Sequence, residues 1–338
     1  MRLALDAMGG DDAPRAMVQG ALDYAIAHPN HQVILVGRQA DLTAAIAVEG
    51  GSGRTNVVIA DAPQVISMSA KIAALKEFPN DSMNRTALLV KEGKADAMVL
   101  CGNTGCSVAA AQLHLRRIPG VKRAGILVSL PNPRGHTWIC DGGANAVCRP
   151  EHLVQFAEMG AAFLETVLGV SRPKVGVLSI GEEDEKGVEL TQETRELLRQ
   201  TTLNVVGNVE GHDIYSGELD VVVCDGFVGN IVLKTSEGVA EGIAKILKEE
   251  IHKGFLTTLG GALVRPAFRG LKRRVDWRHV GGCPLLGVDG VCIIGHGRSD
   301  RTAITNALGQ AARFAEARLV DRLREHFRNQ AATVAAAQ

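Results

Sequence analysis

Four glycine-rich segments that follow short apolar runs could together bind a phosphate-sized anion. They are LALDAMGGDDAP at residues 3–14, VLCGNTGCS at 99–107, VVCDGFVGN at 222–230 and CIIGHGRSD at 292–300. Glycine allows the backbone to approach an anion closely, and the first turn of a following helix offers unpaired N–H groups. Each segment alone could be only a tight turn. Four of them favour a binding site where the strands of an α/β sheet end.

Charged and nucleophilic side chains in and near these segments leave structural and chemical alternatives open. Asp6 could cap its glycine turn or position a ligand, and His296 could donate a proton near neutral pH or simply belong to its turn. Lys186, in the acidic loop GEEDEKG, could reach an anion, although charged loops are usually only solvated. A helix start favours the thiolate of Cys106, but no histidine is close in sequence, so we interpret this cysteine as a packing residue.

Several motifs of well-known enzyme classes are absent from the sequence. It contains no GxxxxGKS/T, no GxGxxG after a predicted strand, no HExxH and no GxSxG. These absences argue against a P-loop NTPase, a dinucleotide-binding oxidoreductase, a metal-dependent hydrolase and a serine esterase. None of the seven cysteines forms a CxxC pair, which indicates reduced thiols in a cytosolic protein and argues against a metal site.

The charge balance and the hydropathy pattern narrow the class of protein further. The 338 residues include 37 Lys plus Arg and 37 Asp plus Glu, so the formal net charge is zero. That balance argues against a nucleic-acid-binding protein. The sequence contains no run of 18 apolar residues, the length that a membrane-spanning helix needs. The early Asp6 is not typical of a signal peptide. We therefore expect a cytoplasmic protein that meets charged partners through local patches.

The elements that must position these side chains alternate along the chain. The sequence predicts strands at residues 3–5, 33–36, 57–60, 97–101, 125–130, 137–141, 175–180, 205–208, 221–224 and 291–295. It predicts helices at residues 14–28, 40–48, 83–92, 105–116, 151–168, 188–201, 229–252 and 300–328. Apolar strands alternating with helices indicate a mostly parallel sheet covered on both faces. We expect one large α/β domain over residues 1–328, with an excursion at 253–282 and a disordered tail at 329–338.

The excursion contains a basic apolar segment, residues 253–278, that does not fit the alternation. It carries seven Lys and Arg against one Asp, and Gly260, Gly261 and Pro266 should weaken any single long helix there. The residues expected at a membrane are Phe255, Leu256, Leu259, Leu263, Arg265, Arg269, Lys272, Arg273 and Arg274. Apolar side chains beside a basic cluster are typical of a surface that lies on anionic lipid. A contact with an acidic protein, a dimer contact and a purely structural role are the alternatives.

Read together, six segments resemble the bacterial phosphate acyltransferase family, in the order of that family, from residue 1 to about residue 306. They are DAMGGDDAP, SMNRTALLVKEGKADAMVLCGNTG, DGGANAVCRPEHLVQFAEMG, PKVGVLSIGEEDEKG, DVVVCDGFVGNIVLKTSEG and GGCPLLGVDGVCIIGHGRSD. The resemblance implies transfer of a fatty acyl group from acyl carrier protein to inorganic phosphate, the first step toward phosphatidic acid. It implies a three-layer α/β/α fold like that of isopropylmalate dehydrogenase, a homodimer and peripheral attachment to the membrane. The acyl phosphate would supply a membrane glycerol-3-phosphate acyltransferase.

The resemblance also suggests which residues act in the site. We expect catalytic roles for Asn103, Asn230, His296 and Lys186. The residues expected to bind phosphate or substrate are Asp6, Gly9, Gly10, Ser82, Gly102, Thr104, Gly105, Asn145, Asp225, Gly226, Gly229, Lys234, Gly297 and Ser299. Phosphate is already a nucleophile and a thiolate leaves without being protonated, so the reaction requires neither a cofactor nor a metal ion.

Three other functions remain as alternatives. A phosphate acetyl- or butyryltransferase that uses coenzyme A would share this chemistry. A metal-dependent hydroxy-acid dehydrogenase would share the fold. A non-catalytic lipid-surface scaffold would use the basic apolar segment alone.

Overall fold

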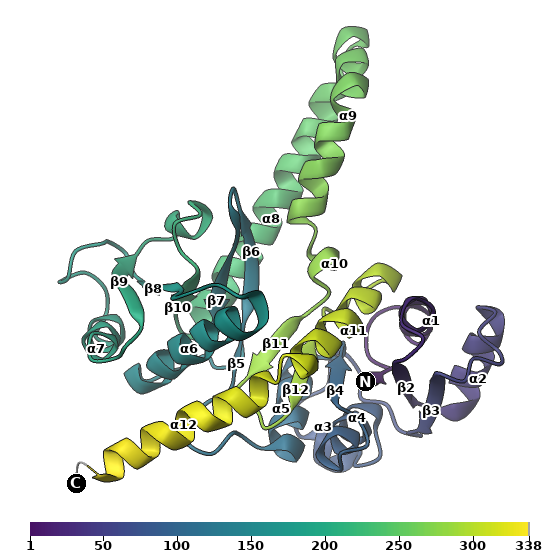
Figure 1. Cartoon of the computed structure of the whole chain (residues 1–338). Helices are drawn as coiled ribbons and strands as arrows, with labels where there is room; N and C mark the ends of the chain where they lie inside the picture. Colours follow the sequence, from purple (N-terminus) through teal and green to yellow (C-terminus); the bar gives the residue numbers. More distant parts are fainter. Residues whose placement is uncertain (337–338) are drawn as a thin grey trace.

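The computed structural model describes residues 1–336, whose strands form two sheets in two lobes (Figure 1). The first sheet has seven strands in the order β3-β2-β1-β4-β12-β11-β5. In that order the strands span Val57–Asp61, Gln32–Gly37, Arg2–Asp6, Ala97–Leu100, Val291–Ile294, Cys283–Leu286 and Gly125–Ile126. The five strands from β3 to β12 run parallel, whereas β11 is antiparallel to both of its neighbours.

The second sheet has five strands in the order β6-β7-β10-β8-β9. These strands span Val128–Asn132, Gly135–Cys140, Val221–Val223, Lys174–Leu178 and Asn204–Val209. The edge strand β6 pairs antiparallel with β7, and the other neighbours pair parallel. Parallel strands end at the same edge of a sheet, so the loops after β7, β8 and β10 lie next to one another.

Helices cover both faces of the first sheet, as its apolar strands predict. Leu3 and Leu5 of β1 pack in one buried cluster with residues of α1 (Arg15–Ala27) and α11 (Arg301–Glu316). Ala4, between them, points to the opposite face and packs in a second cluster with residues of α4 (Ser82–Lys91) and α5 (Thr104–Leu115). Alternation of this kind places two helix layers around one sheet. The predicted α/β class, the mostly parallel sheet and the helix cover are confirmed.

The remaining helices connect and flank the two lobes. They are α2 (Gln39–Val48), α3 (Ala74–Glu77), α6 (Pro150–Phe163) with a π-helical turn at Leu164–Leu168, α7 (Glu189–Leu198), α8 (Gly226–Ile251), α9 (Phe255–Val275), α10 (Trp277–Val280) and α12 (Leu319–Ala336). The single helix predicted at 300–328 is two helices, because Arg318 between them has φ 54°, outside the helical range. Helix α12 continues to Ala336, beyond residue 329, where the tail was expected; residues 337–338 lie outside the described part.

Helices α8 and α9 form an antiparallel hairpin that projects from the body of the molecule (Figure 1). The protruding segment was predicted, but the expected weakening of a long helix was wrong, since Phe255–Val275 is one helix with Pro266 inside it. A Cβ on Gly261 would lie 2.4 Å from Ile251 Cγ2, so this glycine lets α9 approach the end of α8 closely. Along residues 1–336 we find no helix that is both long and apolar enough to cross a membrane.

Candidate functional site

Three of the four glycine-rich turns meet at one edge of the first sheet. They follow β1, β4 and β12, which are neighbouring parallel strands. The Asp11 N–H donates to the Gly297 carbonyl at 2.8 Å, which joins the first turn to the third. A Cβ on Gly9 would lie 2.7 Å from the Gly102 nitrogen, so only glycine allows the first turn to lie against the second. The predicted convergence of four turns is therefore present for three, whereas the fourth follows β10 of the second sheet.

Two buried oxygens beneath these turns lack hydrogen-bond partners. Asp6 Oδ1 accepts from the Met8 N–H at 3.1 Å, but Asp6 Oδ2 makes no hydrogen bond of ordinary geometry. Burial raises the pKa of Asp6 to about 6, and the Ser82 hydroxyl and the Met8 N–H only partly offset this. Ser299 Oγ is also buried and unpaired. Buried polar atoms are usually satisfied, and besides these two only Glu158 Oε2, Ser179 Oγ and Asn208 Oδ1 are buried and unpaired within the described residues.

The loop after β7 forms the corresponding edge of the second sheet, and its organising residue is Asp141. This carboxylate is fully buried and accepts five hydrogen bonds at 2.7–3.1 Å. The donors are the backbone N–H groups of Ile126, Gly143, Ala144 and Asn145 and the Asn145 side-chain amide. Burial raises the pKa of Asp141, and these donors oppose that shift. Sequence analysis missed Asp141, although it ends an apolar strand before glycines exactly as Asp6 does.

The fourth glycine-rich turn packs against this loop at the start of α8. The Gly226 N–H donates to the Asn145 carbonyl at 2.7 Å. A Cβ on Gly229 would lie 2.0 Å from the Asp141 carbonyl oxygen, so a glycine is required here for the helix to pack directly on the loop. Asp225 Oδ1 accepts from the Val228 N–H at 2.8 Å and caps the helix. The Asp225 carboxylate is therefore used to stabilise the N-terminus of α8.

Farther along, α8 reaches the turn after β12 and so connects the two edges. Lys234 forms an ion pair with Glu237 at 2.8 Å, and Arg298 approaches Glu241 at 3.8 Å. Burial lowers the pKa of His296, and the nearby Lys234 cation lowers it further. His296 Nδ1 accepts from the Arg298 N–H at 3.0 Å, which leaves the proton of the neutral ring on Nε2. His296 can therefore donate a hydrogen bond without carrying a charge.

The three candidate asparagines have different environments. Asn103 Oδ1 accepts from the Cys106 N–H at 3.0 Å, and its Nδ2 donates to the Met68 carbonyl at 2.7 Å. Asn145 Nδ2 donates to the Ala124 carbonyl and to Asp141. Both amides thus hold loops together. The Asn230 side chain is exposed, lies beside Gly143 and has no hydrogen bond within residues 1–336.

The other candidates lie either at the turns or away from them. Gly10, Thr104 and Gly105 are at the turns, and Thr104 is exposed at the start of α5. Ser82 is buried at the start of α4, within reach of Asp6. Lys186 stays within its own loop, where its N–H donates to the Glu183 carbonyl and its carbonyl accepts from Asn208. No contact of the described residues brings Lys186 to the glycine turns.

A loop that sequence analysis did not select also borders the site. The Met68 carbonyl accepts the hydrogen bond from the Asn103 amide. The Met68 side chain lies against the turn after β12, where a Cβ on Gly297 would be 2.5 Å from Met68 Cε. Ile72 of the same loop lies next to Gly105. No glycine or charge motif marks residues 67–72, so the sequence carries no signal for this role. The arrangement offers N–H and hydroxyl donors to an anion beside exposed apolar side chains.

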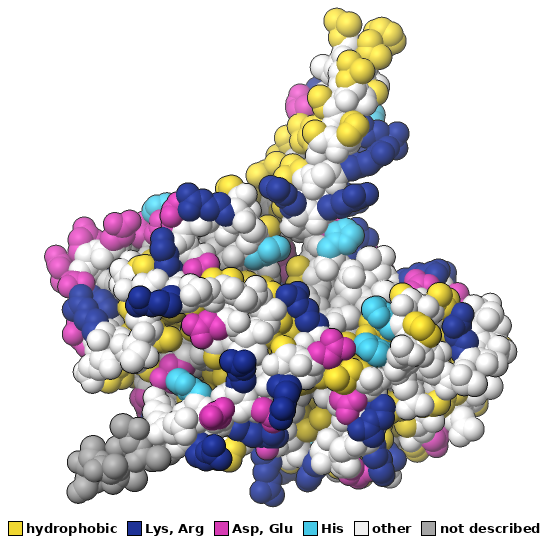
Figure 2. Space-filling view, in the orientation of Figure 1, with side chains coloured by type: hydrophobic (Ala, Val, Ile, Leu, Met, Phe, Trp, Pro, Cys, Tyr) yellow, Lys and Arg dark blue, Asp and Glu magenta, His cyan; other side chains and the backbone are white. Residues whose placement is uncertain are grey.

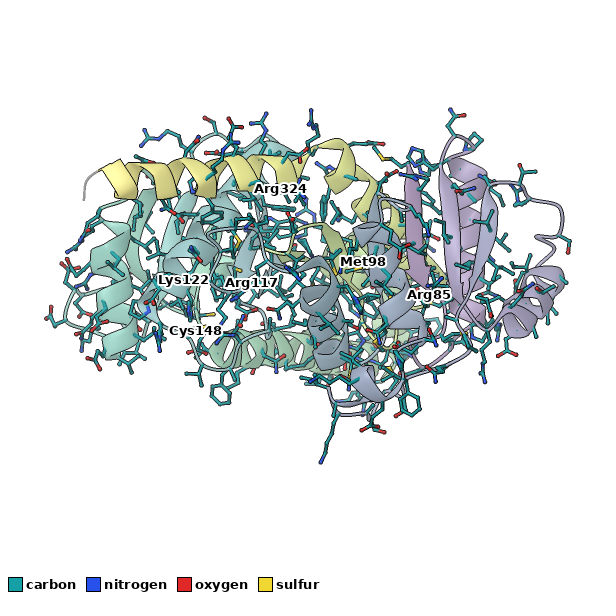
Figure 3. All side chains as sticks on the ribbon, turned by 90° about the horizontal axis from the view of Figure 1, so that it is seen from below. Arg85, Met98, Arg117, Lys122, Cys148 and Arg324 are labelled. Carbon is teal, nitrogen blue, oxygen red and sulfur yellow. The ribbon has the colours of Figure 1, made fainter. Side chains whose placement is uncertain are left out.

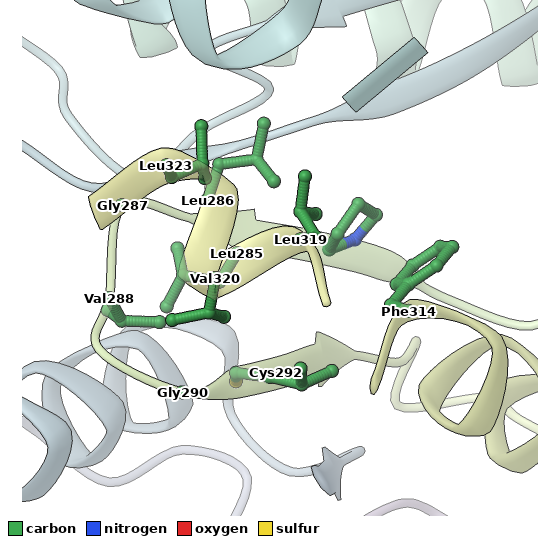
Figure 4. A pocket seen from close by; sticks show the side chains of 12 residues that line it. Leu285, Leu286, Gly287, Val288, Gly290, Cys292, Phe314, Leu319, Val320 and Leu323 are labelled. Carbon is green, nitrogen blue, oxygen red and sulfur yellow. The ribbon is translucent and has the colours of Figure 1, made fainter. Parts of the chain in front are cut away.

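A small apolar cavity lies apart from the glycine turns, between β11, β12 and the junction of α11 and α12 (Figure 4). It is lined by Leu285, Leu286, Phe314, Leu319 and Leu323 among others. Its volume of about 20 Å³ suits about one water molecule, so it cannot hold a long acyl chain. Within residues 1–336, no group of three His, Cys, Asp or Glu side chains is placed to hold a metal ion.

Comparison with known proteins relates nearly the whole chain to one family. Residues 1–322 match the family model described as fatty acid synthesis protein. The phosphate acyltransferase of Pelotomaculum thermopropionicum is 44% identical over 325 residues, which cover 96% of this chain and 94% of that protein. The phosphate acyltransferase of Myxococcus xanthus is 46% identical over 323 residues, which cover 94% of this chain and 90% of that protein.

Solved structures with low sequence identity share the fold. A phosphotransacetylase from Streptococcus pyogenes superposes with a TM-score of 0.62 at 15% identity, covering 95% of this chain and 94% of that one. A phosphotransacetylase from Staphylococcus aureus gives a TM-score of 0.60 at 16% identity, covering 93% and 94%. At this identity the comparison relates the folds alone.

Proposed function

This chain belongs to the phosphate acyltransferase family, and from that premise we propose that it transfers a fatty acyl group from acyl carrier protein to inorganic phosphate. The product is an acyl phosphate, the first intermediate toward phosphatidic acid, which a membrane glycerol-3-phosphate acyltransferase would consume. The observation that supports this assignment best is the convergence of three glycine turns at the ends of the neighbouring parallel strands β1, β4 and β12. Glycine turns that lead into helix starts offer backbone N–H groups, and such groups suit a phosphate anion.

The proposed reaction needs only positioning and charge stabilisation. A phosphate oxygen attacks the thioester carbonyl carbon, an O–C bond forms, the C–S bond breaks, and the carrier thiolate leaves with the bonding electron pair. The Asn230 amide, the Thr104 hydroxyl and His296 Nε2–H are suited to donate to the phosphate or to the developing oxyanion. Lys234 balances part of the phosphate charge. Holding the two reactants together accounts for a large part of the rate.

The acyl chain needs an apolar surface that begins at the reacting carbonyl, and we propose that four exposed side chains provide it. Met68 and Ile72 flank the turns after β12 and β4, as described above. Phe227 and Ile231 lie two turns and one turn before Lys234, on the same face of α8. An apolar chain leaving the anion site would pass between these two pairs.

Release of the carrier thiol tests the proposed function directly. With palmitoyl-acyl carrier protein as the donor, we expect free thiol only when phosphate is present, with one acyl phosphate formed per thiol. Palmitoyl-coenzyme A should react with a lower kcat/KM. Faster reaction of acetyl- or butyryl-coenzyme A would instead support the coenzyme A-dependent alternative. Thiol release that does not depend on phosphate would contradict both.

We propose further that the protein attaches reversibly to anionic membranes through the α8–α9 hairpin. Phe255, Leu256, Leu259 and Leu263 are each more than half exposed, and Figure 2 shows apolar side chains at the tip of the hairpin with Lys and Arg nearer the body. An apolar tip followed by cations matches the order of acyl chains and anionic headgroups in a bilayer.

Vesicle sedimentation checks this attachment. We expect binding to anionic vesicles, weaker binding to neutral ones, and loss of binding in high salt, because each cation near the surface contributes about 1 kcal/mol that salt screens. The L259E/L263E variant should remain in the supernatant with unchanged thiol release. Equal sedimentation of this variant and the unmodified protein would show that the hairpin is not the anchor.

A homodimer is also part of the proposal. Val239, Ile243 and Ile246 form an exposed apolar stripe along one face of α8. A second copy of the chain would remove this stripe from water.

A further inference from the structure

A basic surface separate from the hairpin lies beside the loop after β7. It is formed by Arg117, Lys122 and Arg123, between α5 and β5, and by Arg149, at the start of α6; we call these four residues the Arg123 cluster. All four side chains are exposed. Residues 116–123, RRIPGVKR, contain four cations and no acid in a chain whose net charge is zero. Figure 3 labels Arg117, Lys122 and Cys148 in one part of its view. Burial raises the pKa of the Cys148 thiol, and the nearby Arg123 cation opposes that shift.

Hydrogen bonds hold the backbone of this surface against α6. The Arg117 guanidinium donates to the Lys122 carbonyl. The Lys122 N–H donates to Gln155 Oε1 at 2.7 Å, and Gln155 Nε2 donates to the Gly120 carbonyl at 2.9 Å. Hydrogen bonds thus restrain the backbone that carries these cations, so less conformational entropy is lost when a partner binds.

The positive charge of this surface is largely uncompensated. Lys122 lies 3.5 Å from Glu151, whereas Arg117, Arg123 and Arg149 form no ion pair with any residue of the described chain. The field of these cations reaches the neighbouring side chains: burial lowers the pKa of His152, and Arg123, Lys122 and Arg149 lower it further, against an opposing effect of Glu151. Clustered unpaired cations attract a partner of opposite charge and steer its approach.

This surface also has an exposed apolar side chain next to it, and the same loop contacts the start of α8. Val147, two residues before Arg149, is 84% exposed. Asn145, two residues earlier, accepts from the Gly226 N–H at the start of α8, four residues before Asn230. A protein that covered the Arg123 cluster would therefore lie beside the loop that holds the start of α8, close to Asn230.

We propose that the Arg123 cluster and Val147 form the docking surface for the acidic carrier protein that presents the thioester. The proposal rests on the proposed function, since it assigns the donor of that reaction to a place on the molecule. Charge complementarity and the short path to Asn230 favour a protein here. The hairpin that carries the basic apolar segment projects elsewhere and contributes none of these residues (Figure 1).

Steady-state kinetics with two donors tests the docking surface. For the R123E/R149E variant we expect KM for palmitoyl-acyl carrier protein to rise at least 10-fold and to lose most of its dependence on salt. With palmitoyl-pantetheine, which lacks the carrier protein, kcat and KM should stay within about twofold, and so should KM for phosphate. The R123K/R149K variant should retain most of the affinity for the carrier. Both residues are exposed, and a thermal melt should confirm an unchanged fold.

A second charge reversal on the hairpin serves as the matched control. R265E/R269E removes two cations of α9 and should weaken vesicle binding without changing KM for the carrier thioester. An unchanged KM for the carrier thioester in R123E/R149E would overturn the docking surface. A variant whose only change is loss of vesicle binding, or only a changed sedimentation coefficient, would overturn it as well. Absence of phosphate-dependent thiol release from either donor in the unmodified protein would instead overturn the proposed function.

Discussion

Replacing Asn230 with alanine is expected to lower phosphate-dependent turnover about 100-fold at saturating substrate, the size of effect seen when one oxyanion donor is removed. The Asn230 amide is exposed beside the loop after β7 and has no hydrogen bond within residues 1–336, so it is free to meet a substrate. Alanine favours a helix more than asparagine, so α8 should lose no stability. Turnover and a thermal melt of the same variant provide the measurement.

The matched control is Asn103→Ala, which removes a side-chain amide that is hydrogen-bonded within the protein. Asn103 caps α5 and donates to the Met68 carbonyl, so its loss should lower the free energy of unfolding by about 1 kcal/mol. Turnover of the folded variant should fall less than that of Asn230→Ala. If Asn230→Ala keeps near-normal turnover while Asn103→Ala loses it, the oxyanion donor belongs to the turn after β4 instead.

Replacing Asp6 with asparagine is expected to raise the free energy of unfolding by up to about 3 kcal/mol at pH 8. Burial raises the pKa of this carboxyl from 3.8 to about 6, so at pH 8 the folded protein carries a charge that its surroundings disfavour. Asparagine has nearly the same shape without the charge, its oxygen can accept from the Met8 N–H, and its amide can donate to Ser82 Oγ.

The pH dependence of this effect has a definite sign. Between pH 4 and 6 the folded form holds the Asp6 proton more tightly than the unfolded form, so this carboxyl lowers stability as the pH rises through that range. The gain from Asp6→Asn should therefore be largest at pH 8 and roughly half as large at pH 5. Urea unfolding at the two pH values measures it.

Asp141→Asn is the contrasting variant, because an amide in that position would face several of the five N–H donors with its own N–H groups. It should destabilise the protein. If Asp6→Asn destabilised the protein as much as Asp141→Asn at pH 8, the Asp6 carboxylate would have to accept stabilising hydrogen bonds, as that of Asp141 does.

Elements buried on both faces were predictable from the sequence because their apolar character is local. The strand expected at 33–36 is Gln32–Gly37, and the helix expected at 83–92 is Ser82–Lys91. Strand β11, Cys283–Leu286, was not predicted, since it contains a proline and pairs antiparallel with segments from two different parts of the chain. The predicted strand at 125–130 is divided between the two sheets, because residues 125–126 pair with β11 and residues from 128 onward with β7.

The glycine turns of the candidate site were predictable for a similar reason. A strand that ends in glycines before a helix is visible in a few consecutive residues, and parallel neighbours must end at one edge. Which polar side chains remain free at that edge was not predictable. The partners of Asn103 and Asn145, the Met68 and Ala124 carbonyls, are 35 and 21 residues away in the chain.

The sequence by itself determined the α/β class, the glycine turns at the strand ends, the protruding basic apolar segment and the family, because each depends on residue type and order along the chain. Only the tertiary structure decided that the Asn230 amide is free while those of Asn103 and Asn145 hold loops. It alone separated Asp6, whose Oδ2 is unpaired, from the fully bonded Asp141, and brought Arg123 and Arg149 close to His152. Hydrogen-bond satisfaction and charge clustering depend on groups that folding brings together from distant parts of the chain.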